Sequence, residues 1–320
     1  MTKGGTRRKS WQAYLFNLIV RARMRPYAKK PIDPEFVRRN MGRPRAVREF
    51  MLRRSGSRVR SDVHFNRQPP GEWVYGSDAN DSSLTVLYLH GGGFIACSPK
   101  THRPLVGSLM TRLNARAFVP QYRLAPEHPF PAAADDAIAA YRFLVEDVGV
   151  NPSQIVIAGD SAGGGLALST AQSLSKYNLP QPAAIIVYSP WTDLASTGAS
   201  LEENSEKCSM FAAITIRRAA AFYLGATPST DPRASPLYGN FEGLAPLLIH
   251  ASEDEVLRDD SARVAERAKV AGVEVNYRLW KGVPHCWQFF AGAMPEAVES
   301  LAITTEFVRK HVSVRADDLR

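Results

Sequence analysis

Short apolar segments alternate with longer amphipathic segments along the chain from residue 84 onward. The apolar segments predict strands, and helical spacing of the apolar residues between them predicts helices. Strands are expected at 84–89, 117–121, 154–158, 184–188, 247–250 and 273–280, and helices at 133–148, 164–177, 260–272 and 295–312. Strands that alternate with helices are typical of a parallel sheet with crossover connections, so the sequence predicts an α/β fold.

Two segments interrupt this alternation. Residues 1–50 precede the first clear strand, and residues 195–225 form a long insertion after the strand at 184–188. We see no internal repeat and no low-complexity linker in the sequence. We therefore expect one α/β domain, formed by 51–194 and 226–320, that carries a small helical cap formed by 1–50 and 195–225.

The first apolar run, residues 11–20, predicts an amphipathic helix of the cap. Gln12 and Asn17 interrupt the run, and Arg21 and Arg23 follow it where a signal peptide would have a small-residue cleavage site. Its apolar residues share one helical stripe, which we expect to pack against another part of the protein. The stripe consists of Trp11, Tyr14, Leu15, Leu18, Ile19 and Ala22.

Charge is unevenly distributed along the chain. Residues 1–60 hold 18 Lys and Arg against 3 Asp and Glu, whereas the remaining 260 residues hold 22 against 28. A basic segment of this kind is able to bind nucleic acid or an anionic membrane. Because no basic motif is interleaved with aromatic residues, we interpret the charge as a solvated face of the cap and expect no nucleic-acid partner. No apolar run approaches the roughly 20 residues of a membrane span.

The three cysteines are Cys97, Cys208 and Cys286. Their odd number and irregular spacing argue against a disulfide framework and against a metal site. This pattern is typical of a reducing compartment, so we expect a cytoplasmic protein without a bound metal.

The segment Gly159-Asp160-Ser161-Ala162-Gly163 matches G-x-S-x-G between a predicted strand and a predicted helix. In this context the serine occupies a sharp turn that exposes its hydroxyl, and side chains at the two glycine positions would clash. A glycine-rich phosphate loop is the alternative, but no G-x-x-x-x-G-K-[ST] motif is present. Ser161 is therefore the candidate nucleophile.

A glycine loop, His90-Gly91-Gly92-Gly93, follows the predicted strand at 84–89. Acyl transfer develops negative charge on a carbonyl oxygen, and backbone amides that already point at it stabilise that charge. The candidate oxyanion-hole donors are the amides of Gly92, Gly93 and Ala162. His90 is expected to anchor the loop and not to take part in the chemistry.

A serine nucleophile of this kind needs a histidine and an acid later in the chain. Only His285 and His311 follow the acidic candidates, and His311 falls within the predicted last helix, so His285 is the candidate base. The acid should follow the strand at 247–250, where five carboxylates are available. They are Glu253, Asp254, Glu255, Asp259 and Asp260, and composition does not choose among them.

Over residues 75–310, the chain resembles the bacterial hormone-sensitive-lipase-like esterases, a branch of the α/β-hydrolases. The resemblance lies in the motifs at 90–94 (HGGGF), 122–127 (YRLAPE), 159–164 (GDSAGG) and 231–236 (DPRASP), together with the acid and histidine loops. In that family the acid lies in an Asp-x-Leu-x-Asp stretch, 30 residues before the histidine. Glu255 occupies this frame ahead of His285, although the family more often has aspartate there; Asp254 is the alternative.

The resemblance implies a serine carboxylesterase that needs no cofactor and hydrolyses short- to medium-chain acyl esters through an acyl-enzyme intermediate. Its expected partner is a small-molecule ester, and a homodimer is one candidate assembly. A non-catalytic small-molecule-binding protein on the same fold is the alternative function. The apolar cap residues are expected either to line an acyl or alcohol pocket or to pack the cap helix; they are Trp11, Tyr14, Leu15, Leu18, Met210 and Phe211.

Overall fold

The computed structural model describes residues 10–40, 49, 58–60, 68–77, 79 and 84–312. Its centre is a sheet whose eight described strands follow the order β1-β2-β4-β3-β5-β6-β7-β8. β2 pairs antiparallel with β1 and β4, and the other neighbouring strands are parallel. The predicted α/β fold with a mostly parallel sheet is confirmed.

The strands have the following bounds: β1 Arg58–Arg60, β2 Gly71–Tyr75, β3 Thr85–Leu89, β4 Arg116–Pro120, β5 Ile155–Asp160, β6 Ala184–Tyr188, β7 Leu247–Ser252 and β8 Val275–Trp280. The helices have the following bounds: α1 Trp11–Met24, α2 Pro34–Asn40, α4 Pro99–Leu113, α5 Ala132–Arg142, α6 Ala162–Ser173, α7 Ser200–Glu203, α8 Ala213–Leu224, α9 Arg258–Val270 and α10 Pro295–His311. Each strand and helix expected from residue 84 onward is present, with its ends shifted by a few residues.

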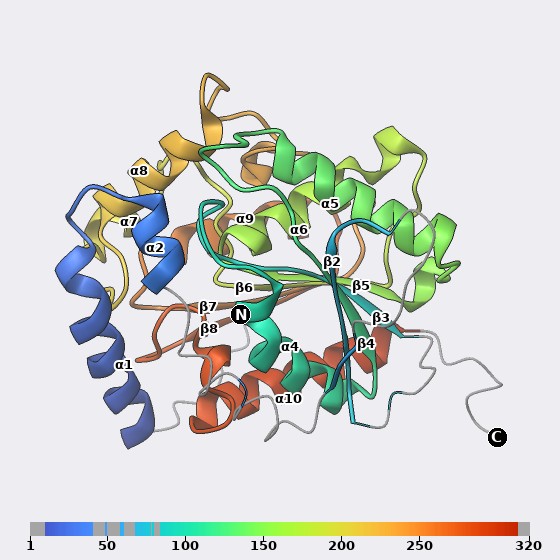
Figure 1. The fold of residues 1–320 in the computed structure, drawn as a ribbon, viewed down its shortest axis with the longest axis horizontal. Helices are drawn as coiled ribbons and strands as arrows, with labels where there is room; N and C mark the ends of the chain where they lie inside the picture. Colours follow the sequence, from blue (N-terminus) through green and yellow to red (C-terminus); the bar gives the residue numbers. More distant parts are fainter. Residues whose placement is uncertain are drawn as a thin grey trace.

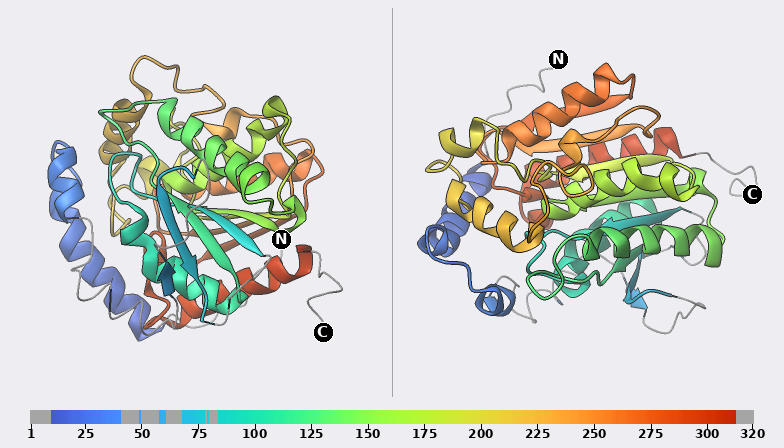
Figure 2. Two further views of the ribbon diagram at one scale, coloured as in Figure 1. Left: turned by 45° about the vertical axis from the view of Figure 1, so that its right-hand side comes forward. Right: turned by 90° about the horizontal axis from the view of Figure 1, so that it is seen from above.

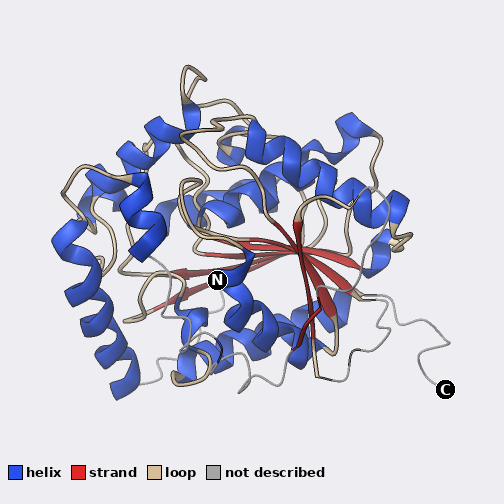
Figure 3. Ribbon diagram, viewed as in Figure 1, coloured by secondary structure: helices blue, strands red, loops and turns tan. Residues whose placement is uncertain are grey.

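Helices cover both faces of the sheet (Figure 1; Figure 3). α5, α6 and α9 pack on one face, and α4 and α10 pack on the other. The central strand β5 contributes Ile155 and Ile157 to one core and Val156 and Ala158 to the other. A strand buried on both faces is apolar at every position, which explains why the sequence shows short continuous apolar runs instead of alternation.

Sequence patterns do not predict β1, β2 or α4. β2 is short, contains Gly71 and Glu72, and pairs antiparallel near the sheet edge. The α4 segment contains Pro104 and Gly107, and both residue types weaken a helix prediction. In the structure these two residues are buried in a helix that packs against β2, β4 and α10.

The two segments assigned to the cap lie side by side at one end of the sheet (Figure 2). The Arg25 guanidinium donates to the carbonyl oxygens of Ser205 and Phe211, and Arg218 of α8 donates to those of Lys29 and Lys30. Residues 1–9, 41–48 and 50 of the expected cap lie outside the described residues. The division into a cap and an α/β domain stays a prediction.

The prediction of how α1 packs is wrong in one respect. The helix forms over Trp11–Met24, but the stripe expected to be buried faces solvent: Trp11 is 71% exposed and Tyr14 67%. The opposite face, with Ala13 and Val20, is buried instead. Both faces of the helix carry apolar residues. The predicted buried face is the one with the larger apolar side chains, and periodicity alone does not distinguish it from the face that packs.

None of the helices in the described part of the chain is both long and apolar enough to cross a bilayer.

Candidate active site

Ser161 lies at the sharp turn between β5 and α6. Its backbone has φ 53° and ψ −124°, a conformation that L-residues rarely adopt. A Cβ at Gly159 would lie 2.3 Å from the Gly163 carbonyl oxygen, and a Cβ at Gly163 would lie 2.1 Å from that of Leu89. The turn therefore forms only with glycine at both positions, as the motif predicts, and the serine side chain is left 9% exposed.

Asp160, the residue before the serine, ties the turn to the glycine loop. Its buried carboxylate accepts hydrogen bonds from the Tyr88 hydroxyl (2.9 Å) and the Gly91 amide (3.2 Å), and it lies 3.2 Å from the His102 Nε2 atom. Burial alone would raise the pKa of Asp160. The nearby His102 ring and the hydrogen bonds that the Asp160 carboxylate accepts outweigh this effect and hold the pKa below its usual value. Asp160 is therefore a buried anion that fixes the first glycine of the loop.

The remaining glycines of the loop leave their amides free. Gly92 and Gly93 have φ 121° and 63°, and the Gly92 carbonyl oxygen accepts from the amides of Ile95 and Ala96 in a tight turn. Within the described part of the chain, the Gly92 and Gly93 amides donate no hydrogen bond. Ala162 is the first residue of α6, where helix amides have no intrahelical acceptor. The loops that Asp160 joins thus contribute three backbone donors that have no acceptor among the described residues.

His90 stays outside this donor set. Its ring stacks on Tyr122, with centroids 4.2 Å apart, and its Nδ1 atom lies 2.8 Å from the Gly91 carbonyl oxygen. Burial lowers the pKa of His90 to about 3, so the ring is neutral at physiological pH. The ring packs beneath the loop, as expected for an anchor.

Glu255 and His285 form a buried pair at the ends of β7 and β8. The His285 Nδ1 atom is hydrogen-bonded to the Glu255 Oε2 atom, and the Ser252 amide donates to Oε1 (2.8 Å). Their side chains are 1% and 3% exposed. The His285 Nε2 atom is buried without a hydrogen-bond partner in the described residues, so it is able to accept a proton.

The other four carboxylates considered as the acid are engaged elsewhere. Glu253 pairs with Lys281, and Asp254 accepts from the Gly282 amide (3.3 Å). Asp259 pairs with Arg258, whereas Asp260 accepts from the amides of Thr192 and Asp193. Burial raises the pKa of Asp260 to about 7. Of the five candidates, Glu255 alone contacts the histidine ring.

Contacts around residue 286 bring the histidine loop to the serine turn. The Cys286 amide donates to the Ser189 hydroxyl (3.3 Å), and the Cys286 thiol donates to the Tyr188 carbonyl oxygen (3.9 Å). The Ser161 amide donates to the same carbonyl oxygen, 2.8 Å away. Ser161 and the residue that follows His285 therefore share the Tyr188 carbonyl oxygen at the end of β6.

The second cap segment borders these groups. The Phe211 ring lies edge-on to His285 with centroids 5.3 Å apart, and a Cβ at Gly93 would lie 3.7 Å from the Cβ of Ala219 on α8. Asn204, which is 1% exposed, donates to the carbonyl oxygens of Glu253 and Glu255 and so holds the acid loop.

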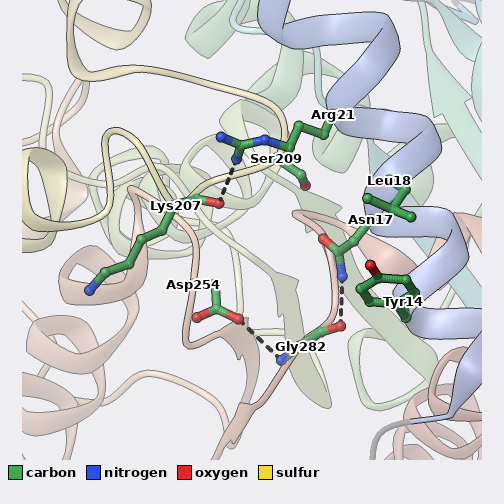
Figure 4. Close-up of a pocket in the computed structure, with 8 residues that line it drawn as sticks. All are labelled: Tyr14, Asn17, Leu18, Arg21, Lys207, Ser209, Asp254 and Gly282. Carbon is green, nitrogen blue, oxygen red and sulfur yellow. Dashed lines mark hydrogen bonds between the residues drawn. The ribbon is translucent and has the colours of Figure 1, made fainter.

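The α1 residues expected either to line an acyl or alcohol pocket or to pack the cap helix, Trp11, Tyr14, Leu15 and Leu18, are exposed. Tyr14 and Leu18 line a cavity of about 240 Å³, together with Asp254 and Gly282 (Figure 4). Asn17 spans one side of this cavity and donates to the Gly282 carbonyl oxygen (2.6 Å). None of the candidate catalytic residues lines the cavity, although two of its walls belong to the acid and histidine loops.

Sequence reasoning missed several residues that position the site. Asp160 stands inside the G-x-S-x-G motif, where the variable position carries no signal of its own. His102, Asn17 and Asn204 lie in helices or loops remote in sequence, and nothing in the pattern marks them. In the described residues, no group of three or more His, Cys, Asp or Glu side chains is arranged to hold a metal ion.

Comparisons with known proteins agree with this architecture. Residues 86–289 match a family model described as the alpha/beta hydrolase fold. The chain is 40% identical over 238 residues to an acetyl-hydrolase of Streptomyces hygroscopicus, covering 74% of this chain and 79% of that protein. It is 35% identical over 223 residues to an esterase of Acinetobacter venetianus, covering 69% and 73%.

Solved structures extend the likeness to almost the whole chain. One is an esterase from the bacterial hormone-sensitive lipase family, with a TM-score of 0.82 and 35% identity over 96% of this chain and 100% of that one. Another, a hormone-sensitive lipase from a metagenome library, has a TM-score of 0.80 and 30% identity over 95% of this chain and 99% of that one.

Replacing Glu255 by alanine should lower kcat for p-nitrophenyl acetate by about 10³–10⁴-fold, because the imidazolium that forms in the reaction loses its buried counter-charge. Asp254→Ala, which removes only a bond to the Gly282 amide, should lower kcat by less than about tenfold. Steady-state kinetics of the two variants side by side make the measurement. A larger loss in Asp254→Ala would reassign the acid.

Asp160→Asn should destabilise the fold by about 2–3 kcal/mol at pH 7, because a buried anion with several hydrogen bonds is replaced by a neutral amide. Since the folded-state pKa of Asp160 lies below its ordinary value of 3.8, this stabilisation is present above pH 3.8 and is lost as the pH falls through the folded-state pKa. The difference from the parent protein in urea unfolding should therefore shrink at acid pH.

The control for this variant is Asp135→Asn, because Asp135 pairs with Arg233 at the surface and its side chain is 48% exposed. It should change the free energy of unfolding by no more than about 0.5 kcal/mol at any pH. An Asp160→Asn protein as stable as the parent at pH 7 would contradict the role of the carboxylate.

Proposed function

The chain belongs to the hormone-sensitive-lipase-like esterases of the α/β-hydrolase fold and is a carboxylesterase, and from that premise we propose that it cleaves acyl esters with Ser161, His285 and Glu255 as its catalytic triad. The observation that carries the proposal is the His285 ring. One of its nitrogens is bonded to a buried carboxylate, and the other is buried without a hydrogen-bond partner among the described residues. The next residue, Cys286, contacts the Tyr188 carbonyl oxygen that also accepts from the Ser161 amide, which supports a position of this ring near the serine.

In the first step the His285 Nε2 atom takes the proton of the Ser161 hydroxyl, and the serine oxygen attacks the ester carbonyl carbon. Glu255 stays ionised, holds the proton of the imidazole on Nδ1 and stabilises the imidazolium. The carbonyl oxygen becomes an oxyanion. When the tetrahedral intermediate collapses, His285 gives the proton to the leaving alcohol and Ser161 keeps the acyl group.

The oxyanion is stabilised by the amides of Gly92, Gly93 and Ala162. Support comes from their lack of other acceptors and from the Asp160 bridge, which fixes the glycine loop against the serine turn. Donors held in place before the reaction need no reorganisation when charge develops. Losing one donor of this type typically costs about 10²–10³ in kcat.

In the second step water attacks the acyl-enzyme, with His285 again as the base, and the carboxylic acid leaves. No cofactor, metal or nucleic acid takes part in this scheme. All six residues belong to one chain, so the chemistry does not require a homodimer. We propose a cytoplasmic location, which is supported by three cysteines that remain unpaired.

We propose short- to medium-chain acyl esters as substrates. Phe211 beside His285 and Ala219 beside Gly93 place apolar groups next to both the base and the oxyanion donors, where an acyl chain would lie. The acetyl-hydrolase name of the Streptomyces relative agrees with a small acyl group.

Ser161→Ala should lower kcat for p-nitrophenyl acetate by about 10⁶-fold, because loss of the nucleophile leaves only oxyanion stabilisation and binding. A fluorophosphonate probe should label Ser161 in the parent protein, as mapped by peptide mass spectrometry. Ser175→Ala, an exposed serine just after α6, is the matched control and should keep full activity. A Ser161→Ala protein that retains a tenth of the activity would refute the nucleophile, and ligand binding without turnover in the parent would favour the non-catalytic alternative.

In a series of p-nitrophenyl esters from acetate to palmitate, kcat/KM should be highest for the shorter acyl chains. It should be lower by about tenfold or more for palmitate, because an acyl chain longer than the pocket gains no further contacts there. Phe211→Ala should shift the optimum towards longer chains by removing the ring beside His285. An optimum at palmitate in the parent protein would contradict the proposed substrate class.

A further inference from the structure

Exposed apolar side chains concentrate on the cap. Of the eleven large hydrophobic residues exposed in the described chain, eight belong to the cap segments. Five of these form one stripe along α1, which we term the α1 face: Trp11 (71% exposed), Tyr14 (67%), Leu15 (42%), Leu18 (45%) and Ile19 (49%). The other three exposed residues, Val270, Leu279 and Val298, lie on separate elements. A stripe of exposed apolar side chains on one helix is typical of an interaction site.

The α1 helix is anchored through its opposite face. Phe16 packs against Phe290 with ring centroids 4.4 Å apart, and Ala13 and Val20 are buried. Ser10 caps the helix and donates from its amide and hydroxyl to the Glu296 carboxylate (2.9 and 2.8 Å). The helix is therefore anchored at the edge of the protein (Figure 2), and the residues of the α1 face are exposed.

Positive charge flanks the α1 face. On a helical projection Arg21 lies beside Tyr14 on one side of the stripe, and Arg23 lies beside Ile19 on the other. Both arginines are exposed, and their guanidinium groups donate to backbone carbonyl oxygens; among the described residues neither arginine pairs with a carboxylate. Residues 10–40 as a whole hold seven Lys and Arg against two Asp and Glu, and residues 1–60 hold 18 against 3.

We propose that the α1 face docks this enzyme onto an anionic lipid surface. A helix with Trp, Tyr, Leu and Ile on one side and arginines along both edges has the composition of helices that lie in the plane of a membrane interface. The aliphatic side chains enter the acyl region, Trp11 and Tyr14 lie at the headgroup level, and the basic residues contact anionic headgroups.

A second copy of the chain is a poorer occupant of this face. Two α1 faces brought together would bring the exposed arginines that flank each face, Arg21 and Arg23, towards those of the other copy, and like charges disfavour that contact. Nucleic acid accounts for the basic residues but offers no environment for Leu15, Leu18 and Ile19. Only an anionic lipid surface satisfies both the apolar stripe and its charged edges, and this inference does not depend on which ester the enzyme cleaves.

The test is co-sedimentation of the full chain with vesicles. Vesicles of phosphatidylcholine mixed equally with phosphatidylglycerol should pellet the protein, and pure phosphatidylcholine vesicles should pellet much less. The combined variant Trp11→Ser, Leu15→Ser and Ile19→Ser should lower the partition coefficient on the mixed vesicles by about tenfold or more, because three apolar side chains no longer insert. Raising the salt concentration should weaken binding of the parent protein.

The matched control is Val270→Ser with Val298→Ser, two exposed apolar residues on α9 and α10. It should bind vesicles like the parent. Both variants should keep parent activity on soluble p-nitrophenyl acetate, which shows that they are folded and separates this result from the outcome for the triad.

Three results would overturn the proposal. One is absence of vesicle binding by the parent protein. Another is vesicle binding that the triple variant retains, because the basic segment alone would then account for it. The third is a dimer in light scattering that the triple variant abolishes while vesicle binding is unchanged, which would assign the face to a second copy.

Discussion

The left-handed backbone of Ser161 is the constraint around which the site is built. A residue with a side chain is held in this conformation only when its surroundings leave no alternative. Here the surroundings are a strand buried on both faces, a helix that starts at the next residue, and two glycines at which a Cβ would clash with a carbonyl oxygen. The buried Asp160 carboxylate adds a fixed link to the glycine loop. The strain is local, and the packed sheet supplies the rigidity that maintains it.

The order of strands in the sheet brings the other groups to this turn. β5, β6, β7 and β8 are consecutive parallel neighbours, so the loops after β5, β7 and β8 emerge at one edge. Groups distant in sequence meet there because parallel strands present their carboxyl ends together. Ser161, Glu255 and His285 each follow directly from one of these strands or its loop. Their placement at one edge of the sheet is therefore a property of the topology.

Sequence patterns predicted the parts of this structure that depend on local chemistry. The buried strands, the long helices and the serine turn are each encoded within a few neighbouring residues, and all are present. The patterns failed where a choice depends on tertiary neighbours. Both faces of α1 carry apolar residues, so periodicity did not identify the face that packs against the protein. β2 is too short and too polar for its pattern to predict a strand. The five carboxylates after β7 are equivalent in sequence, and the contact between Glu255 and His285 distinguishes them only in three dimensions.

Two amide side chains of the cap segments are joined to the loops that carry the acid and the base. Asn17 bonds to the backbone three residues before His285, and Asn204 bonds to the backbone of Glu255 itself. Both segments assigned to the cap are thus part of the scaffold that holds the acid and histidine loops of the proposed triad. Substitutions in the cap segments that admit a new ester would therefore also lower the catalytic rate, unless the hydrogen bonds of Asn17 and Asn204 to these loops are kept or replaced. Substrate range and catalytic rate are consequently linked traits in this architecture and are not free to evolve independently.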